Sequence, residues 1–350
     1  MMRRCRGCGA ILQGEDKTRI GYTPKEDSDY CQRCFRLIHY DDLTVSMKTG
    51  IDPDTVLNGI ADMDGLILHV ADLFDFEACM IPGLMRKINE RDMILACTKR
   101  DILPDTVSHD KIAQFVFGRL KEYGIHVKEL VLLSGKTKTG LEELKAAVER
   151  HADGRRVIVM GKANSGKSTL LNALSGTAAL TSSRYPGTTL DFNQLEIDGM
   201  TYIDTPGIEL QNSMLMAVPE QELKNVIPTK TVRPVVYQIH EDQSYAVGGL
   251  TRVDVECASK ATVTWYLSDR LYLHRSRLAG ADALWQKQYG KLLVPVPVER
   301  EFRKLNYHPG GEKTDVVIDG LGWCSISGAV SSITVHSPKQ VNVTFRKAML

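Results

Sequence analysis

The stretch VIVMGKANSGKSTLLNAL, Val157–Leu174, joins an apolar run to a glycine-containing loop and a second periodic run. The first run predicts a buried strand, and TLLNAL predicts a helix that begins near Lys167. The loop between them, Gly161–Ser168, fits the pattern G-x4-G-K-[ST], in which backbone N–H groups surround phosphates at the N-terminus of a helix. The stretch therefore predicts an α/β fold with a phosphate-binding loop, although about half of the chain precedes it.

This loop and two segments after it predict the groups that handle phosphate and magnesium. Lys167 is expected to reach the β and γ phosphates, and the Ser168 hydroxyl to ligate Mg²⁺. The strand MTYID ends in Asp204-Thr-Pro-Gly207, where the carboxylate can hold magnesium through water and the Gly207 N–H can contact the γ phosphate. Between them, SRYPGTTLD offers Thr188 and Thr189 as candidates for the remaining magnesium ligand. The expected phosphate contacts also include Gly161, Asn164, Ser165, Gly166 and Thr169, and the expected catalytic residues are Lys167, Thr189, Asp204 and Gly207.

Two further motifs predict which base is bound. ILACTKRD reads as a buried strand that ends in Thr98-Lys99-Arg100-Asp101. A carboxylate at Asp101 can accept both N1–H and the exocyclic amine of guanine, whereas adenine lacks that pair of donors. The Lys99 stem can lie across the base, and the backbone amides of Ser134-Gly135-Lys136 are expected to contact the guanine carbonyl. Thr139 and Glu142 fit a capping box that opens the next helix.

The motifs occur in an unusual order: TKRD, SGK, GKANSGKS, PGTT and DTPG. This resembles the translation-factor class of GTPases with the base motifs moved in front of the phosphate motifs. Such a permutation keeps the site intact, because ligands bind at the carboxyl ends of parallel strands whatever order the connections take. The helix LEELKAAVERHA needs only the link DGRR to reach the strand of the phosphate loop, and a helix around VPEQELKNVI leads from DTPG into the last part of the chain.

Four of the eight cysteines form two C-x2-C pairs, Cys5 with Cys8 and Cys31 with Cys34. Two such pairs allow four thiolates to surround one ion tetrahedrally, and zinc is the first choice. The intervening segment is too polar to build its own core, so the metal would supply much of its folding free energy. A chance set of reduced thiols and an iron–sulfur or redox role are the alternatives. With no signal-peptide pattern and no apolar run of about 20 residues, the protein is expected in the cytoplasm without a membrane span.

The chain is predicted to have three parts: a zinc module at 1–45, a permuted P-loop GTPase domain at 46–228 and a β-rich domain at 229–350. The last part alternates with period two over several short segments, with one helix expected near SRLAGADALWQKQYG. It carries 16 Lys/Arg against 11 Asp/Glu, whereas the whole chain has a net charge of +1. A basic surface there would suit an RNA backbone, and an ordinary solvated surface explains the charges equally well. The basic candidates are Arg252, Arg270, His274, Arg275, Arg277, Lys287 and Lys291.

The whole chain resembles the bacterial YqeH family of circularly permuted GTPases. The resemblance rests on the four-cysteine module, the permuted motif order and the C-terminal domain. It also rests on CRGCGAILQ at Cys5–Gln13, CQRCFRLIHY at Cys31–Tyr40 and DLFDF at Asp72–Phe76. It implies hydrolysis of GTP and a role in assembly of the small ribosomal subunit, with ribosomal RNA or a ribosomal protein as partner. The oligomeric state does not follow from it.

The resemblance also implies three features of the site. The residue after DTPG is Ile208, where many GTPases carry a glutamine that orients the attacking water, so intrinsic turnover is expected to be slow. Asn164 matches the position that ligates potassium in cation-dependent members, so K⁺ is an expected cofactor beside Mg²⁺ and Zn²⁺. The base motif departs from the family pattern, because Thr98 stands where asparagine is usual. We therefore expect lower guanine affinity, with specificity retained through Asp101.

Two functions from different classes compete. The first is a GTP-hydrolysing molecular switch, in which GTP and magnesium order the loops at Thr188–Thr189 and Asp204–Gly207 and hydrolysis releases them. The second is an RNA- or protein-binding adaptor in which the nucleotide only stabilises the fold, and Ile208 keeps this interpretation open. A zinc-dependent redox or nuclease enzyme ranks lower, because no acid/base constellation surrounds the cysteines.

Overall fold

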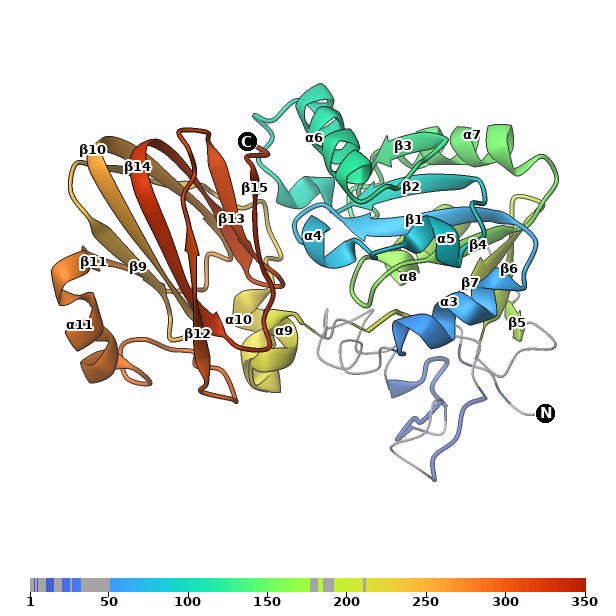
Figure 1. Ribbon diagram of the computed structural model, residues 1–350. Coiled ribbons are helices and arrows are strands. Elements are labelled where there is room, and N and C mark those ends of the chain that lie inside the picture. The colour runs from blue at the N-terminus through green and yellow to red at the C-terminus, as the bar shows by residue number, and fades with distance from the viewer. Residues whose placement is uncertain are drawn as a thin grey trace. The chain divides into compact units, whose positions relative to one another are not determined.

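The computed structural model describes residues 3, 5, 11–15, 21–25, 27–32, 51–176, 182–184, 192–209 and 212–350. The chain forms two compact units, whose elements are labelled in Figure 1. The first unit comprises residues 1–73, 79–100 and 118–209, and the second comprises residues 74–78, 101–117 and 210–350. The second unit thus takes two segments from the first half of the chain, and the predicted divisions after residues 45 and 228 stay predictions. No helix within the described ranges is both long enough and apolar enough to cross a membrane.

The first unit is built on a seven-stranded sheet with the spatial order β3-β2-β1-β4-β7-β6-β5. Neighbouring strands from β3 to β7 pair in parallel, whereas β6 is antiparallel to β7 and to β5. The strands are β1 (Leu66–Asp72), β2 (Met93–Thr98), β3 (Glu129–Leu132), β4 (Val157–Met160), β5 (Ser182–Arg184), β6 (Asn193–Ile197) and β7 (Met200–Asp204). The helices are α3 (Pro53–Ala61), α5 (Leu84–Lys87), α7 (Leu141–Ala152) and α8 (Lys167–Ser175), while α4 (Phe76–Cys79), η1 (Arg100–Ile102) and α6 (His109–Glu122) cross the division between the units.

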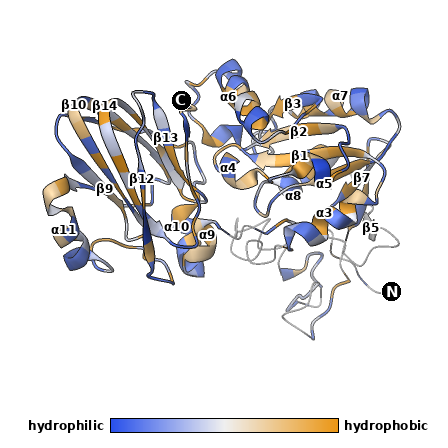
Figure 2. Ribbon diagram, in the orientation of Figure 1, coloured by the Kyte–Doolittle hydropathy of each residue, from blue (hydrophilic) through white to orange (hydrophobic). Residues whose placement is uncertain are grey.

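The inner strands of this sheet are buried on both faces. All residues of β1, β2 and β4 are buried, which explains why these segments are mostly apolar without alternation. Leu66, Leu68 and Val70 of β1 pack in one cluster with the apolar sides of α7 and α8. Figure 2 shows the hydrophobic colouring along this central part of the sheet. The predicted parallel α/β architecture is confirmed.

The strand and the helix on either side of the phosphate loop lie where the sequence predicts them. The start of α7 does not. The N-cap of α7 is Gly140, which has a φ of 75° and no side-chain capping bond. The predicted capping box from Thr139 is therefore wrong, and the Thr139 carbonyl instead accepts a hydrogen bond from the Ser134 N–H at 3.0 Å. A Cβ at Gly140 would lie 2.4 Å from the Leu132 carbonyl oxygen, so close approach to β3 decides where this helix begins.

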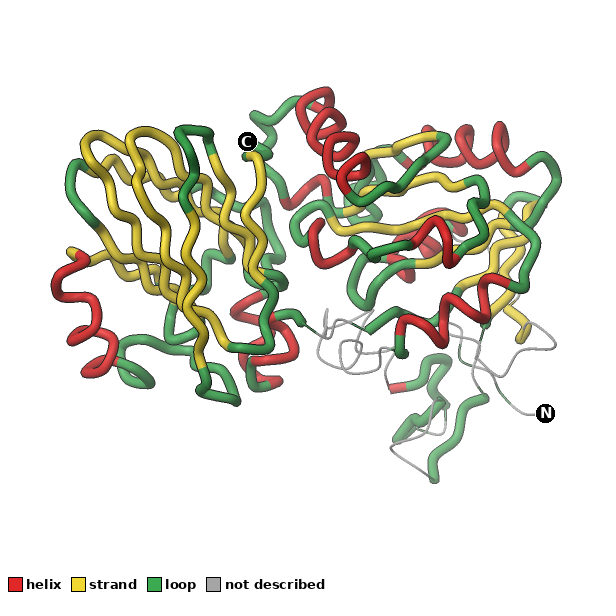
Figure 3. Tube along the Cα trace, viewed as in Figure 1, coloured by secondary structure: helices red, strands yellow, loops and turns green. Residues whose placement is uncertain are grey.

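The second unit is an antiparallel β domain with few helices, as the colours of Figure 3 show. Its eight-stranded sheet follows the path β11-β9-β10-β14-β13-β15, with β12 paired to β14 and β8 paired to β10. The strands are β8 (Val235–Ile239), β9 (Gln243–Val247), β10 (Thr251–Leu267), β11 (Leu273–Arg277), β12 (Phe302–Tyr307), β13 (Thr314–Ile318), β14 (Gly322–Pro338) and β15 (Val343–Lys347). The helices are α9 (Met214–Ala217), η2 (Glu220–Glu222), α10 (Leu223–Val226), η3 (Leu278–Gly280) and α11 (Ala281–Gln288).

The predicted β-rich domain and its helix α11 are confirmed, but the strands are longer than predicted. Segments that the sequence separates merge into β10 and β14, each of 17 residues. Their pairing shifts register around Cys257, where polar residues interrupt the alternation. Strands β12 and β15 were not predicted, because basic residues break their apolar pattern.

Arg252 does not belong to the predicted basic surface. It is only 5% exposed, and its guanidinium donates to the Asp254 carboxylate at 2.9 Å. Asp254 also lies 3.0 Å from His336 Nε2 and accepts from the Ser244 hydroxyl at 2.6 Å. Arg252 therefore completes a buried polar network in the sheet and is not available to an RNA backbone.

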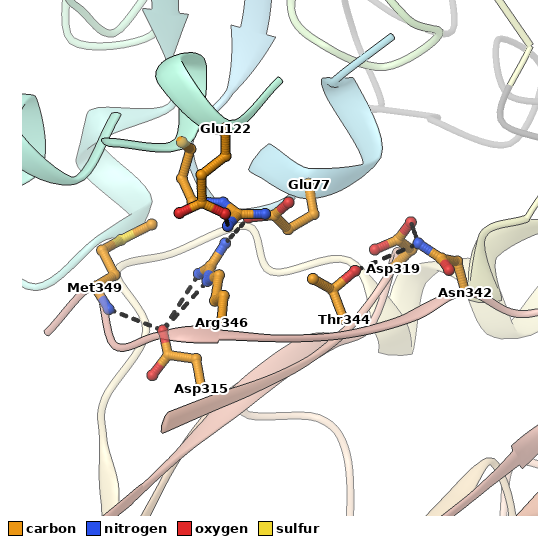
Figure 4. A network of polar contacts seen from close by, with 9 residues as sticks. Glu77, Glu122, Asp315, Asp319, Asn342, Thr344, Arg346 and Met349 are labelled. Atoms are coloured by element: carbon orange, nitrogen blue, oxygen red, sulfur yellow. Dashed lines mark hydrogen bonds and ion pairs between the residues drawn. The ribbon is translucent and has the colours of Figure 1, made fainter. Parts of the chain in front are cut away.

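A buried ion-pair network joins three segments of the second unit (Figure 4). Arg346 of β15 donates to Glu77 at 2.9 Å and to Asp315 at 3.4 Å, and all three side chains are at most 2% exposed. Its guanidinium lies 4.5 Å from the ring centre of Phe115. The Met349 N–H also donates to Asp315 at 2.9 Å. Burial raises the pKa of Asp315, and Arg346 opposes that shift.

We expect Arg346→Ala to destabilise the second unit by about 3–5 kcal/mol, because it removes the cation that lies between two buried carboxylates. Urea unfolding followed by tryptophan fluorescence measures this, since all three tryptophans lie in the second unit. Arg277→Ala is the matched control: Arg277 also pairs with a glutamate, Glu241, but its side chain is 79% exposed, so a loss below about 1 kcal/mol is expected. Equal effects of the two substitutions would contradict the role of the buried network.

Candidate nucleotide-binding site

Three parallel strands of the first unit end at the same edge of its sheet. Strands β1, β2 and β4 are parallel neighbours, so the segments that follow Asp72, Thr98 and Met160 leave the sheet at the same edge. Strands β2 and β3 lie on one side of β1, whereas β4 and β7 lie on the other. Ligands of parallel sheets bind at such a switch point, and the phosphate loop follows β4 there.

The phosphate loop needs backbone conformations that few residues adopt. Gly161 has a φ of 156°, and a Cβ there would lie 2.3 Å from the Val70 carbonyl oxygen of β1. Gly166 has a φ of 95° and Asn164 a φ of 64°, a left-handed conformation that asparagine tolerates. Loops of this kind turn consecutive backbone N–H groups toward a bound anion. The predicted phosphate-binding loop is therefore built as the motif requires.

Lys167 and Ser168 open the helix α8 directly behind this loop. Lys167 is 7% exposed, and its ammonium donates to the carbonyl oxygens of Gly161 at 2.9 Å and Lys162 at 3.3 Å. These bonds hold the positive charge inside the loop, beside the N–H groups of the helix N-terminus. The arrangement concentrates positive potential where phosphate oxygens are expected.

Thr98 links the base motif to the phosphate loop. Its hydroxyl lies 2.6 Å from the Ser165 carbonyl oxygen and 3.2 Å from the Ala71 carbonyl oxygen, and the side chain is buried. A Cβ at Gly166 would meet the same hydroxyl at 3.2 Å. Threonine therefore joins the two loops here, with one hydrogen to donate where the amide of an asparagine would have two.

Lys99 has a partner that the sequence analysis missed. Its ammonium lies 2.6 Å from the Asp72 carboxylate, and its backbone is left-handed at φ 58°. Asp72 is the last residue of β1 and is 8% exposed at its side chain. A carboxylate at the carboxyl end of a strand neighbouring the TKRD strand was the signal that could have revealed this pair.

The second base motif packs on the first turns of α8. A Cβ at Gly135 would lie 3.0 Å from the Thr169 methyl group, so the close contact favours glycine. Ser134 is buried, and its hydroxyl accepts a hydrogen bond from the Thr137 N–H at 3.1 Å. Lys136 is exposed beside them. The structure thus brings the SGK motif against the helix of the phosphate loop.

The DTPG loop is paired with the phosphate loop through its backbone. The Ala163 N–H donates to the Ile208 carbonyl at 2.8 Å, and the Ile208 N–H donates to the Gly161 carbonyl at 3.2 Å. Gly207 lies so close that a Cβ would approach the Ala163 Cα to 3.2 Å. On the other side, the Ile51 N–H donates to the Gly207 carbonyl at 2.9 Å. The Ile208 side chain is fully buried, so it neither contacts nor orients a water at the site.

Two of the expected magnesium ligands follow neighbouring strands of the sheet. Ser168 lies in the first turn of α8, after β4, and Asp204 ends β7, the parallel neighbour of β4, so their oxygens come from neighbouring segments and suit Mg²⁺. Thr188 and Thr189 lie outside the described residues, as do Cys8 and Cys34. Cys5 and Cys31 are both buried, and the Cys31 N–H donates to the Cys5 sulfur at 3.1 Å. Within the described ranges no group of three or more His, Cys, Asp or Glu side chains forms a metal site.

His69 of β1 is a buried histidine beneath this site. It is fully buried, and the backbone at Cys79 is a polar neighbour of its ring, although neither ring nitrogen makes a hydrogen bond of ordinary geometry within the described residues. Burial lowers the pKa of His69 to about 4, and the charges of Lys167 and Lys162 contribute to the shift. The imidazole is therefore neutral in the folded protein at physiological pH, and protonation of it favours the unfolded chain.

We expect acid to destabilise the first unit through His69. The pKa of His69 rises to 6.5 on unfolding. The contribution of neutral His69 to the unfolding free energy is therefore fully present above pH 6.5 and is lost as the pH falls toward 4. Between pH 7.5 and pH 4.5 the wild-type protein should lose about 2.5 kcal/mol more unfolding free energy than His69→Leu. Urea unfolding followed by circular dichroism measures the difference. His126→Leu, which changes an exposed histidine, should lose as much unfolding free energy between the two pH values as the wild type does. If His69→Leu also lost as much as the wild type, His69 would not be the cause of the acid sensitivity.

Two family models match consecutive parts of the chain. A 50S ribosome-binding GTPase domain matches residues 156–260, and a YqeH-like C-terminal domain matches residues 260–349. Among solved structures, the GNP-bound YlqF of T. maritima is 20% identical and covers 42% of this chain and 54% of that chain, with a TM-score of 0.29. That score is too low to carry a structural argument.

Curated relatives match over nearly the whole length. The Bacillus subtilis protein named YqeH is 34% identical over 361 residues, covering 99% of each chain. NO-associated protein 1 of Arabidopsis thaliana is 26% identical over 387 residues, covering 92% of this chain and 69% of that protein. The GTPase-domain match and the geometry of the two base motifs and two phosphate motifs agree that the chain binds and hydrolyses GTP. With this identity over this length, the chain belongs to the YqeH family of circularly permuted GTPases.

Proposed function

We propose that this GTPase is a nucleotide-controlled switch that acts in the cytoplasm during assembly of the small ribosomal subunit. The observation that carries the proposal is the double attachment of the segment after DTPG. Ile208 is hydrogen-bonded to the phosphate loop in the first unit. A few residues later, the Met214 N–H donates to the Asp319 carbonyl at 2.7 Å, and the Asn212 carbonyl accepts from the Asn342 N–H at 2.8 Å, both within the second unit. A change at the γ phosphate thus has a short covalent route into the C-terminal sheet.

The residues of this chain supply positioning and charge for hydrolysis. Lys167 neutralises phosphate charge, and the Gly207 N–H contacts the γ phosphate while water attacks the γ phosphorus and GDP leaves. Bound Mg²⁺, held by Ser168 and Asp204 and in our proposal by Thr189, would supply electrostatic stabilisation of the phosphates. Because Ile208 is buried and apolar, slow turnover is expected without a further group. We assign this role to a potassium ion near Asn164. A comparison of the rate of GTP hydrolysis in potassium buffer with the rate in sodium buffer tests this assignment.

We also propose that Cys5, Cys8, Cys31 and Cys34 hold one zinc ion. Cys5 and Cys31 are far apart in sequence, yet they lie together, buried, with an N–H bond to the Cys5 sulfur. A backbone N–H that donates to sulfur favours the thiolate form, which is the form that ligates zinc. The zinc would tie the N-terminal segment into one module, because this segment offers little apolar core.

Zinc content tests this proposal directly. The full-length protein should contain about one zinc ion per chain by elemental analysis, and Cys5→Ser and Cys31→Ser should lose most of it. Cys257→Ser is the matched control, since Cys257 is partly exposed in β10 and outside the module, and it should keep the metal. Full zinc content in the Cys5 and Cys31 variants would show that the cysteines do not bind it.

The ribosomal partner is supported by relatives and by exposed charge. The matched GTPase model is described as 50S ribosome-binding, which names the large subunit, whereas the family resemblance points to the small one. Arg270, Arg275 and Arg277 are exposed around β11 of the second unit, and Lys287 and Lys291 are exposed near α11. Exposed cations of this kind suit ribosomal RNA.

Co-sedimentation with purified ribosomal subunits tests the switch. In potassium buffer, more protein should pellet with small subunits when a non-hydrolysable GTP analogue is present than when GDP or no nucleotide is present. The reason is that only the analogue carries a γ phosphate, which in our proposal contacts the DTPG loop. Large subunits serve as the parallel sample. Equal binding in all three nucleotide states would favour the adaptor, and preference for large subunits would replace the proposed partner. Lys167→Ala should abolish the nucleotide dependence if the switch is correct.

A further inference from the structure

The chain that leaves the DTPG loop returns to the base motif before it enters the C-terminal sheet. The Thr231 hydroxyl donates to the Asp101 carbonyl oxygen at 2.8 Å. The next residue, Val232, donates its N–H to the Ile102 carbonyl at 2.9 Å, and both Val232 and Ile102 are 4% exposed. Two consecutive residues thus hold two consecutive carbonyls, that of Asp101 at the end of the TKRD motif and that of Ile102 directly after it, all of them within the second unit.

The held segment is too short to fix its own geometry. Asp101 lies in η1, a single 3₁₀ turn of three residues. Turns of this length have poor hydrogen-bond geometry and little intrinsic stability. The direction of the Asp101 carboxylate follows from the orientation of the peptide groups on either side of it. The bonds from Thr231 and Val232 fix the peptide group that follows Asp101 and the one after it.

We propose that Thr231 and Val232 are positioning residues for guanine recognition. They hold Asp101 in the orientation in which its carboxylate accepts both N1–H and the 2-amino group of guanine. This inference rests on the proposed role of Asp101 as the base reader. A carboxylate held in advance binds the base more tightly, because the nucleotide does not have to order the turn. Selectivity for guanine then depends on the segment that begins the C-terminal domain. A partner that displaces Thr231 weakens guanine binding, and bound guanine weakens the binding of that partner by the same factor.

Binding of two diphosphates to Thr231→Val tests the inference. Valine keeps the shape of threonine and removes the donor. Loss of one neutral hydrogen bond should weaken GDP about fivefold by calorimetry. Inosine diphosphate lacks the 2-amino group and makes one bond to Asp101 where GDP makes two, so its affinity should fall less than about twofold. The ratio of the two affinities should therefore drop, and Thr231→Ser, which keeps the hydroxyl, should restore it.

Two further variants separate the possible failures. Thr262→Val removes a threonine hydroxyl that lies 3.4 Å from Gln238 in the same unit, and it should leave both affinities unchanged. Asp101→Asn should lose GDP affinity and gain xanthosine diphosphate, which presents an acceptor where guanine presents the amine. Unchanged GDP binding in Asp101→Asn would refute the proposed base reader itself. If Asp101→Asn behaves as expected while Thr231→Val weakens both diphosphates equally or neither, only the positioning role is refuted.

Discussion

The close approach of the phosphate loop to β1 is the contact on which the geometry of the first unit depends. A Cβ at Gly161 would lie 2.3 Å from the Val70 carbonyl oxygen, so any other residue there would push β4 and its loop away from β1. Because the loop stays close, the Ser165 carbonyl lies within reach of the Thr98 hydroxyl, and Gly161 and Ala163 pair with Ile208. The base motif and the DTPG loop are thus both attached to the same short backbone segment. The order in which the chain visits these strands is irrelevant to this attachment, which is why the permutation is tolerated.

The sequence predicts those parts of the site in which neighbouring residues of one short segment must be of particular types to bind the ligand. The phosphate loop, the TKRD and SGK segments and the parallel strands before them are recognisable because the required residues are neighbours in the chain. The partners that hold these motifs in place were not predictable, since they lie 27 positions apart for Lys99 and Asp72 and 67 positions apart for Thr98 and Ser165. The capping box at Thr139 failed for a related reason: a tertiary contact at Gly140 overrides a favourable local pattern.

The permuted chain order joins the DTPG motif directly to the segment that begins the C-terminal domain. This segment is anchored tightly at its far end. Ser213 caps α9 through the Leu215 N–H, and a Cβ at Gly320 would lie 2.0 Å from the Ser213 hydroxyl oxygen. Gly320 has a φ of 75°, so both its conformation and its surroundings require glycine. The tight packing fixes the start of α9 against the turn that joins β13 to β14, within the second unit.

The Arg346 network fixes how three segments of the second unit pack together, and this effect is larger than its contribution to the free energy of unfolding. One guanidinium is buried with two carboxylates, and desolvation of such groups offsets most of their mutual attraction, so an apolar trio of the same volume would hold the segments about as strongly. An apolar contact, however, tolerates sliding and alternative packing. Here the planar guanidinium meets Glu77 and Asp315 through different nitrogens while Phe115 covers it, and only one relative placement satisfies all three contacts. Glu77 lies in residues 74–78, so the network holds this short segment against the C-terminal sheet in one arrangement within the second unit.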